Sequence, residues 1–176
     1  MERMGNLMWA RMFGNIVPVL CGVLGVFITN LPFSILGDWL PSPLYALMPV
    51  YFWCLVRPDL MSPVWAFLIG VLHDVLSGGP PGIWAASFVA TYAVIDKQRD
   101  AFAGLAGFGA LLGFATAALI ANVASYVIFA LYHWQLLPVS PFVKEFAVTA
   151  FLYWPVGLLL GLIHRHFVGP LRSELI

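Results

Sequence analysis

Long apolar runs joined by short polar turns constrain this chain more than any other feature of its sequence. Of the 176 residues, 62% are hydrophobic and only 9% are charged, whereas a soluble domain has about 25% charged residues. So few charges cannot cover a surface that faces water, and we expect lipid to surround most of the chain. The runs predict one integral membrane domain over residues 1–176, with spans at about 13–31, 40–56, 63–76, 83–95, 101–131 and 146–163.

The predicted fold class is therefore an all-α bundle of about six transmembrane helices. The runs 40–56, 63–76 and 83–95 are shorter than the roughly 20 residues that a spanning helix usually needs. One alternative joins 63–76 and 83–95 into a re-entrant hairpin around the glycine- and proline-rich turn between them. This alternative removes two crossings and leaves both termini on the same side of the membrane.

The basic residues indicate how the chain is oriented. Membrane proteins keep an excess of Lys and Arg in their cytoplasmic segments. If six spans start from a cytoplasmic N-terminus, Lys144 is the one basic residue of the eight on the opposite side. We therefore predict that both termini are cytoplasmic. The basic residues on the cytoplasmic side are then Arg3, Arg11, Arg57, Lys97, Arg99, Arg165 and Arg172.

The fifth run carries a row of small residues at every fourth position, which places them on nearly one face of a helix. In lipid, helices associate where small residues allow their backbones to approach closely. The row predicts a helix-packing face, either inside the bundle or against the transmembrane helix of a partner. Gly157 and Gly161 give the sixth run a similar face. The residues of the row are Gly109, Gly113, Ala117, Ala121 and Ser125.

Asp74 is the one acidic residue inside a predicted span, near the outer end of the third. An ionised carboxylate in a bilayer is costly unless it is paired or close to water. Two interpretations stay open. In the first, the carboxylate fixes the following turn by accepting backbone N–H bonds around Gly78 and Gly79. In the second, it contacts a partner or ligand in a buried polar pocket.

His73 and Ser77 stand near Asp74, which invites comparison with a catalytic triad. Neighbouring residues on a helix point about 100° apart, so Asp74 would not orient the His73 ring. His164 and His166 face different directions and do not form a metal site. The sequence contains no phosphate loop, dinucleotide fingerprint or paired-histidine zinc motif, and its net charge is zero. We expect no enzymatic activity, no metal, no cofactor and no binding to nucleic acid.

A motif follows the aromatic-rich second run, which reads PLYALMPVYFW at 43–53. It consists of a glycine, an aspartate, a Leu-x-Gly and a second glycine four residues further on, and it includes HDVLSG at 73–78. The pattern resembles that of MreD, the rod shape-determining membrane protein family of bacteria. The Tyr-Trp-Pro at 153–155, followed by a basic tail, is similar to the last span of that family. The motif residues are Gly70, Asp74, Gly78 and Gly82.

This resemblance implies a non-catalytic scaffold in the bacterial cytoplasmic membrane. MreD-like proteins bind MreC, which has one span and a periplasmic coiled coil. The pair works with the actin-like MreB, the RodA glycosyltransferase and a penicillin-binding transpeptidase, and so helps to couple the cytoskeleton to peptidoglycan synthesis in the control of cell shape. On this basis, His73 and the four motif residues would be the contacts to a partner or pocket.

The resemblance also implies a fold similar to the substrate-binding membrane subunit of vitamin uptake transporters. Fold alone does not decide function. The alternative function is therefore that of a substrate-binding membrane subunit of a small-molecule uptake transporter.

Overall fold

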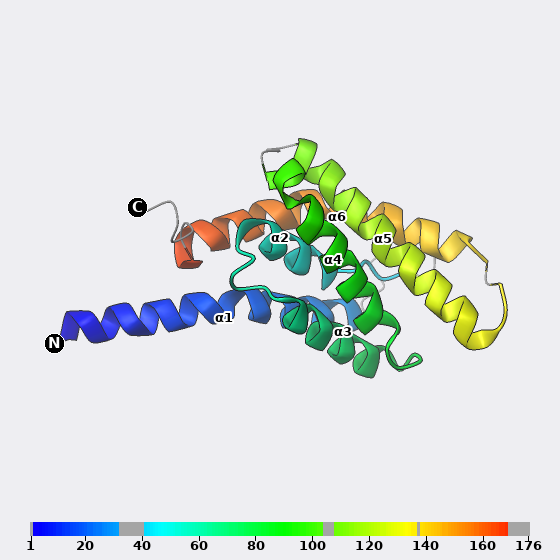
Figure 1. The fold of residues 1–176 in the computed structure, drawn as a ribbon, viewed down its shortest axis with the longest axis horizontal. Coiled ribbons are helices and arrows are strands. Elements are labelled where there is room, and N and C mark those ends of the chain that lie inside the picture. Colours follow the sequence, from blue (N-terminus) through cyan, green and yellow to red (C-terminus); the bar gives the residue numbers. More distant parts are fainter. Residues whose placement is uncertain (1, 32–40, 104–107, 137, 169–176) are drawn as a thin grey trace.

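The computed structural model describes residues 2–31, 41–103, 108–136 and 138–168, with side chains throughout except at 2–15, 99–103 and 108. The described chain forms six α-helices and contains no strand (Figure 1), so the predicted all-α class is confirmed. The helices are α1 (Glu2–Asn30), α2 (Leu47–Val56), α3 (Pro63–Ser77), α4 (Ile83–Ala103), α5 (Phe108–His133) and α6 (Ser140–Ile163), and a π-helical turn, η1 (His164–Val168), follows α6.

The second run does not form the continuous helix that the prediction of a span over 40–56 assumed. Helix α2 has 10 residues and is about 15 Å long, half the thickness of a hydrocarbon core of about 30 Å. Residues 41–46 precede it in a non-helical conformation. Pro41 and Pro43 explain this difference, because proline cannot donate a backbone hydrogen bond and disfavours helix in the residue before it.

The later runs have different bounds from those predicted. Helix α4 continues past residue 95 and takes in Lys97, while α5 begins at Phe108, so the run 101–131 is divided between the two helices. Helix α6 begins at Ser140 instead of 146 and therefore contains Lys144 and Glu145. Hydropathy marks where an apolar run ends, but lysine and glutamate are good helix formers and let a helix continue beyond that point.

Two helical stretches are long and apolar enough to cross a membrane by length and composition, Gly109–His133 and Ser140–Val168. Three further apolar helices, Ile16–Asn30, Leu47–Val56 and Pro63–Ser77, are shorter than 18 residues. Much of the surface of α5 and α6 consists of exposed apolar side chains, including Leu119, Phe151 and Leu158. Large exposed apolar surfaces of this kind indicate contact with lipid or with another protein.

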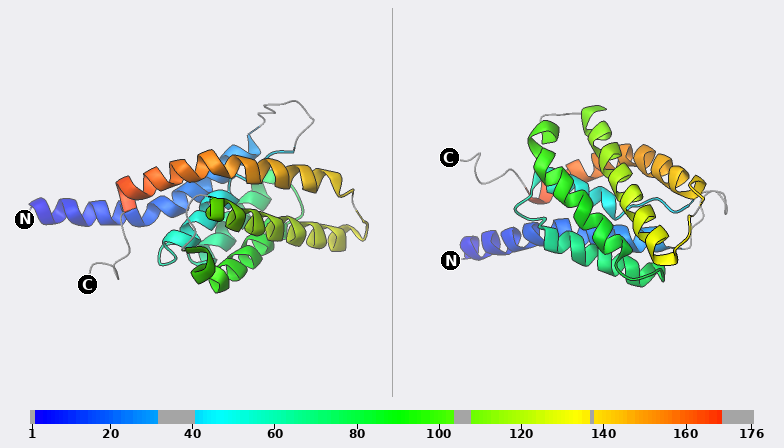
Figure 2. Two further views of the ribbon diagram at one scale, coloured as in Figure 1. Left: turned by 90° about the horizontal axis from the view of Figure 1, so that it is seen from above. Right: turned by 45° about the vertical axis from the view of Figure 1, so that its right-hand side comes forward.

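Helix α2 lies at the centre of the bundle and is apolar around its whole circumference, as expected of a fully buried helix. The ring of Tyr51 on α2 meets Phe114 of α5 edge-on at 5.4 Å and Tyr153 of α6 edge-on at 5.6 Å. Phe114 and Tyr153 stack on each other at 3.9 Å. This aromatic cluster joins α2, α5 and α6, while α3, α4 and α5 lie side by side (Figures 1 and 2).

Several helix ends and turns lie at two opposite ends of the molecule. The start of α1, the α2–α3 turn and the end of α6 lie at one end, on the left in Figure 1. The α3–α4 turn and the α5–α6 turn lie at the other. At the first end, the ring of His164 contacts Trp53 at 5.7 Å and Phe52 at 6.4 Å.

An ion pair closes the α2–α3 turn. Nε of Arg57 donates to Oδ1 of Asp59 at 2.9 Å, and Nη2 donates to Oδ2 at 2.8 Å. The hydrogen bond from the guanidinium lowers the pKa of the Asp59 carboxyl below its usual value. The Asp59 side chain is 47% exposed, so the pair contributes little to stability and serves mainly to fix the turn.

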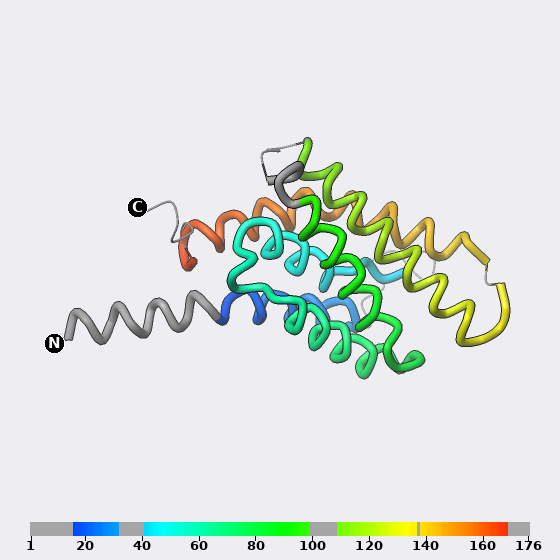
Figure 3. Tube along the Cα trace, viewed as in Figure 1, coloured from blue at the N-terminus to red at the C-terminus, as the bar shows by residue number. Residues whose placement is uncertain are grey.

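The non-helical segment 41–46 runs alongside the helices (Figure 3), and its residues Leu44 and Ala46 are buried. Side-chain hydroxyls satisfy part of its backbone. The N–H of Leu44 donates to Oγ1 of Thr149 on α6 at 3.1 Å. The N–H of Tyr45 donates to Oγ1 of Thr29 on α1, also at 3.1 Å. Buried backbone groups outside a helix need such partners, so the two threonines replace the hydrogen bonds that a helix would have supplied.

A glycine lets this segment approach α1. A Cβ built on Gly25 would lie 2.7 Å from the carbonyl oxygen of Tyr45 and 2.8 Å from Cα of Ala46. Both neighbours are backbone atoms, which cannot move aside as a flexible side chain can. Segment 41–46 therefore packs directly on the backbone of α1.

Replacing Thr149 with valine tests the role of its hydroxyl. Valine has nearly the same shape, but it leaves the buried N–H of Leu44 without its acceptor. An unsatisfied buried donor costs about 1–3 kcal/mol, so we expect a clear fall in the temperature of thermal unfolding in detergent. Thr116→Val is the matched control, because the Thr116 hydroxyl bonds only to Gly113 of its own helix. Equal unfolding temperatures for the two variants would contradict the proposed role.

Candidate functional site

The carboxylate of Asp74 is buried, with 5% of the residue exposed, and it accepts three backbone N–H bonds. Oδ2 accepts from Gly82 at 2.9 Å and from Ala85 at 3.1 Å, and Oδ1 accepts from Trp84 at 2.9 Å. All three donors belong to the start of α4 or to the residue just before it. Asp74 on α3 therefore holds the first turn of α4.

This arrangement is a helix cap supplied by a different helix. The first N–H groups of a helix have no partner within it, and a Ser, Thr, Asp or Asn just before the helix usually accepts one or two of them. Gly82 stands at that place before α4 and has no side chain. Asp74 supplies the missing carboxylate, and its negative charge also interacts favourably with the positive end of the α4 dipole.

The carboxylate accepts backbone N–H bonds as predicted, but the donors differ from those expected around Gly78 and Gly79. Both of these glycines are exposed, so water can satisfy their N–H groups. The donors at the start of α4 lie deeper, where Ala85 is 1% exposed. The carboxylate therefore serves the donors that water reaches least.

The glycines of the motif belong to the same junction between α3 and α4. A Cβ on Gly70 would lie 2.5 Å from Cα of Ala85 and 2.8 Å from its nitrogen, so the two helix backbones touch at this point. Gly78 ends α3 with φ of 65°, and Gly82 precedes α4 with φ of 96°. Residues that carry a Cβ rarely adopt such positive φ values, which is why glycine suits both positions.

His73 and Ser77 do not form a catalytic group with Asp74. Nδ1 of His73 lies 3.1 Å from the amide nitrogen of Asn30 on α1, and its ring meets Trp84 edge-on at 4.9 Å. The hydroxyl of Ser77 donates to the backbone carbonyl of Asp74 at 3.2 Å, not to the carboxylate. The three side chains thus have separate partners. Across the described ranges, no group of three His, Cys, Asp or Glu residues is placed to hold a metal ion.

The predicted row of small residues lies on the packed side of α5. Gly113, Ala117, Ala121 and Ser125 are buried, and Gly109 is half-buried. Helix α5 contacts α4 and α6, so in this structure the row serves packing inside the bundle.

The predicted face on α6 differs. A Cβ on Gly161 would meet no atom within 4 Å, and the nearest atoms to one on Gly157 would belong to Tyr153 of the same helix, at 3.4 Å or more. Helix α6 is also the less buried of the two long apolar helices, with 17% of its most apolar window buried against 33% for α5. Close packing by another part of the described chain is therefore absent at Gly161, and this face is open to lipid or to a partner.

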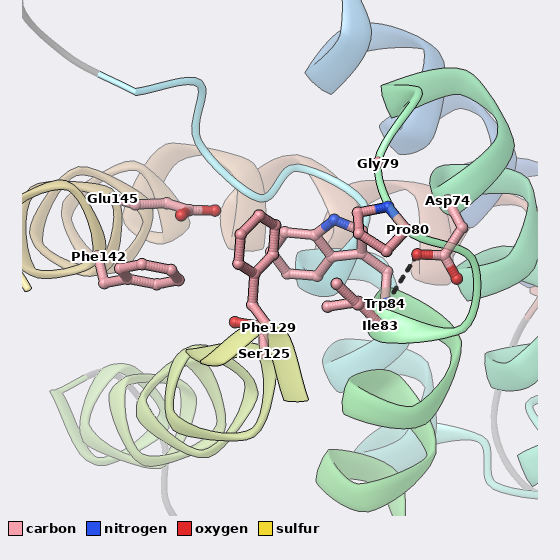
Figure 4. Close-up of a pocket in the computed structure, with 9 residues that line it drawn as sticks. All are labelled: Asp74, Gly79, Pro80, Ile83, Trp84, Ser125, Phe129, Phe142 and Glu145. Carbon is pink, nitrogen blue, oxygen red and sulfur yellow. Dashed lines mark hydrogen bonds between the residues drawn. The ribbon is translucent and has the colours of Figure 1, made fainter. Parts of the chain in front are cut away.

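A cavity of about 190 Å³ lies beside the α3–α4 junction, where α4, α5 and α6 approach each other (Figure 4). Asp74 is at one end of it and Glu145 at the other. The apolar run predicts a sixth span that starts at residue 146, so it leaves Glu145 outside the span and does not indicate its role. Pro141 is the signal that could have found it, since proline favours the first turn of a helix and would have moved the start of the helix to about residue 140. The lining residues are Asp74, Gly79, Pro80, Ile83, Trp84, Ser125, Phe129, Phe142 and Glu145.

Comparison of the chain with protein families, with curated proteins and with solved structures found no match. The resemblance to MreD therefore stays a prediction based on the motif at residues 70–82.

Proposed function

We propose that this chain is a non-catalytic membrane scaffold of the bacterial rod complex, similar in role to MreD. It would bind MreC and help to couple MreB to peptidoglycan synthesis by the RodA glycosyltransferase and a penicillin-binding transpeptidase. The observation that carries this proposal is the arrangement of the motif. Its four residues, Gly70, Asp74, Gly78 and Gly82, together form the junction between α3 and α4.

The motif supports a structural role because its one ionisable group is already engaged. Both oxygens of Asp74 accept backbone N–H bonds from the start of α4. A general acid or base instead has to lie within hydrogen-bond reach of a reacting substrate group. The motif therefore suits a rigid support for partner surfaces better than it suits chemistry.

We further propose that the chain crosses the cytoplasmic membrane six times, with both termini in the cytoplasm. The ends of α1 and α6 that carry the termini lie at the same end of the molecule as the α2–α3 turn, which contains Arg57. The α3–α4 turn lies at the opposite end, which favours full crossings by these helices over a re-entrant hairpin. The distribution of basic residues is consistent with this orientation.

The short helix α2 is compatible with a full crossing if the segment before it is counted. Residues 41–44 add up to about 14 Å of chain before the turn at Tyr45 and Ala46, and with the roughly 15 Å of α2 they come close to the core thickness of about 30 Å. Non-helical backbone at membrane depth is tolerated where protein buries it and supplies its hydrogen bonds. Thr29 and Thr149 supply two of these bonds here.

The alternative function, a substrate-binding subunit of an uptake transporter, is favoured by one observation, the cavity between α4, α5 and α6. Its volume of about 190 Å³ is below the roughly 300–1,000 Å³ of typical small-molecule pockets. It is also lined mostly by apolar residues and offers few polar groups to a polar substrate. The scaffold therefore remains the better-supported proposal.

Purification of the chain from its native membrane in a mild detergent tests the two functions against each other. We expect MreC to be enriched with the tagged chain, relative to an unrelated membrane protein carrying the same tag, because the exposed face of α6 and the rigid junction would support a helical partner. Mass spectrometry of the purified fraction identifies the partners. Enrichment of an ATPase module without MreC would contradict the scaffold and support the transporter subunit.

A further inference from the structure

The carboxylate of Glu145 has no ionic or hydrogen-bonding partner among the residues that the structure describes. It is half-buried and points from α6 into the cavity, toward the rings of Phe129 and Trp84 (Figure 4). A carboxylate that is partly buried against apolar and aromatic side chains is costly unless a cation accompanies it. Glu145 therefore calls for a positively charged group that the described chain does not provide.

The walls of the cavity suit a cation as well. Three aromatic rings line it, those of Trp84, Phe129 and Phe142, and the faces of aromatic rings attract ammonium groups. None of the nine lining residues is Lys, Arg or His. Asp74 adds a second carboxylate at the far end, but the start of α4 already balances its charge. Glu145 is thus the group available to pair with a bound cation.

We propose that this cavity binds the ammonium group of a zwitterionic phospholipid headgroup, with Glu145 as the ion-pairing residue and the three rings as its walls. The volume of about 190 Å³ is smaller than the roughly 300–1,000 Å³ of a typical small-molecule pocket, which suits an ammonium group on a short stem. Exposed apolar side chains close in sequence to the lining residues, Val139 and Val143 at the start of α6 and Val127 on α5, provide a surface for the acyl chains.

The inference rests on the proposed placement in the membrane and does not depend on the rod complex. The cavity lies between the α3–α4 turn, the C-terminal part of α5 and the N-terminal part of α6. In a six-crossing arrangement, these helix ends stand at the membrane interface, the depth at which lipid headgroups lie. A lipid is therefore the nearest source of an ammonium group.

Nanodiscs that contain equal amounts of phosphatidylethanolamine and phosphatidylglycerol test the proposal on the full chain. Native mass spectrometry after release from the discs counts the lipids that remain bound. We expect the wild-type chain to retain phosphatidylethanolamine over phosphatidylglycerol by about tenfold, the factor that an ion pair with cation–π contacts would give. Glu145→Gln should abolish this preference, while Glu145→Asp should keep part of it.

Asp59→Asn is the matched control, because it removes a carboxylate at the opposite end of the molecule and should leave the preference unchanged. If Glu145→Gln does not fold, Phe142→Leu keeps the carboxylate and removes one ring, and it should lower the preference severalfold. A wild-type chain with no preference, or an unchanged preference in a folded Glu145→Gln or Phe142→Leu variant, would overturn the proposal.

Two further arms identify the source of the ammonium group. If soluble phosphoethanolamine displaces the retained lipid, the site binds the headgroup alone. If it does not, binding also requires the acyl chains. Retention of a lysine-rich peptide in place of phosphatidylethanolamine, dependent on Glu145, would overturn the lipid assignment. A chain that does not enter nanodiscs would overturn the membrane placement and this inference with it.

Discussion

Replacing Asp74 with leucine is expected to destabilise the protein by about 3–5 kcal/mol, because three backbone donors at the start of α4 lose their acceptor together. Gly82, at the place of the usual cap, has no side chain that can substitute for the lost carboxylate. Leucine also removes the negative charge that the α4 dipole favours. Thermal unfolding in detergent measures the loss, and in cells it should appear as failing rod shape and less recovered MreC.

Asp74→Asn should be milder. If the amide oxygen takes the place of Oδ2, it keeps the bonds from Gly82 and Ala85, while its NH₂ group faces the N–H of Trp84. One bond is then lost and the other two lose their charge assistance, for which we expect a cost of about 1–2 kcal/mol. The structural role therefore predicts a graded series, with asparagine mild and leucine severe.

Asp59→Leu is the control for this series. It also removes an aspartate beside a turn, but its ion pair with Arg57 is partly exposed and should cost about 0–1 kcal/mol. A catalytic or proton-relay role for Asp74 predicts a different order, in which asparagine is about as damaging as leucine. An Asp74→Asn variant that stays folded and bound to MreC, yet does not support rod shape in cells at all, would contradict the structural interpretation.

Gly70→Ala should destabilise the protein by about 2–3 kcal/mol, although it adds only a methyl group. The new Cβ would lie 2.5 Å from Cα of Ala85, and the atoms that it meets are all backbone atoms of α4. Side chains cannot relieve this contact by changing rotamer, so α3 and α4 would have to separate. Overpacking of a tight site typically costs about 1–3 kcal/mol, and a contact between backbones belongs at the upper end of that range.

Gly161→Ala is the matched control, because it makes the same change inside another helix of the same chain. Its Cβ would meet no atom within 4 Å, so the higher helix propensity of alanine should leave stability unchanged or raise it by up to about 1 kcal/mol. Unfolding temperatures of the two variants, compared under identical conditions, separate packing from propensity. Gly70→Ala with the wild-type unfolding temperature would mean that the helices are not in close contact at this point.

The sequence was most informative where a structure depends on neighbouring residues. The apolar runs predicted the all-helical fold, and Pro63 and Gly78 mark the start and end of α3 as their backbone preferences require. The four-residue spacing in the fifth run predicted a packed face, and Gly113, Ala117 and Ala121 are indeed buried. Each of these features repeats or stops within one element, so periodicity and propensity can detect it.

Only the tertiary structure determines which residues of different elements hydrogen-bond to or contact each other. The donors to Asp74 lie 8 to 11 residues further along the chain, and the acceptor for Leu44 lies 105 residues away. Nothing in the local sequence around Leu44 or Gly70 indicates which backbone approaches it, because that depends on how several helices fill the same space. Glu145 faces the cavity for the same reason: the sequence supplied a carboxylate near a helix start, and only the packing of α4, α5 and α6 placed it among three aromatic rings without a cation.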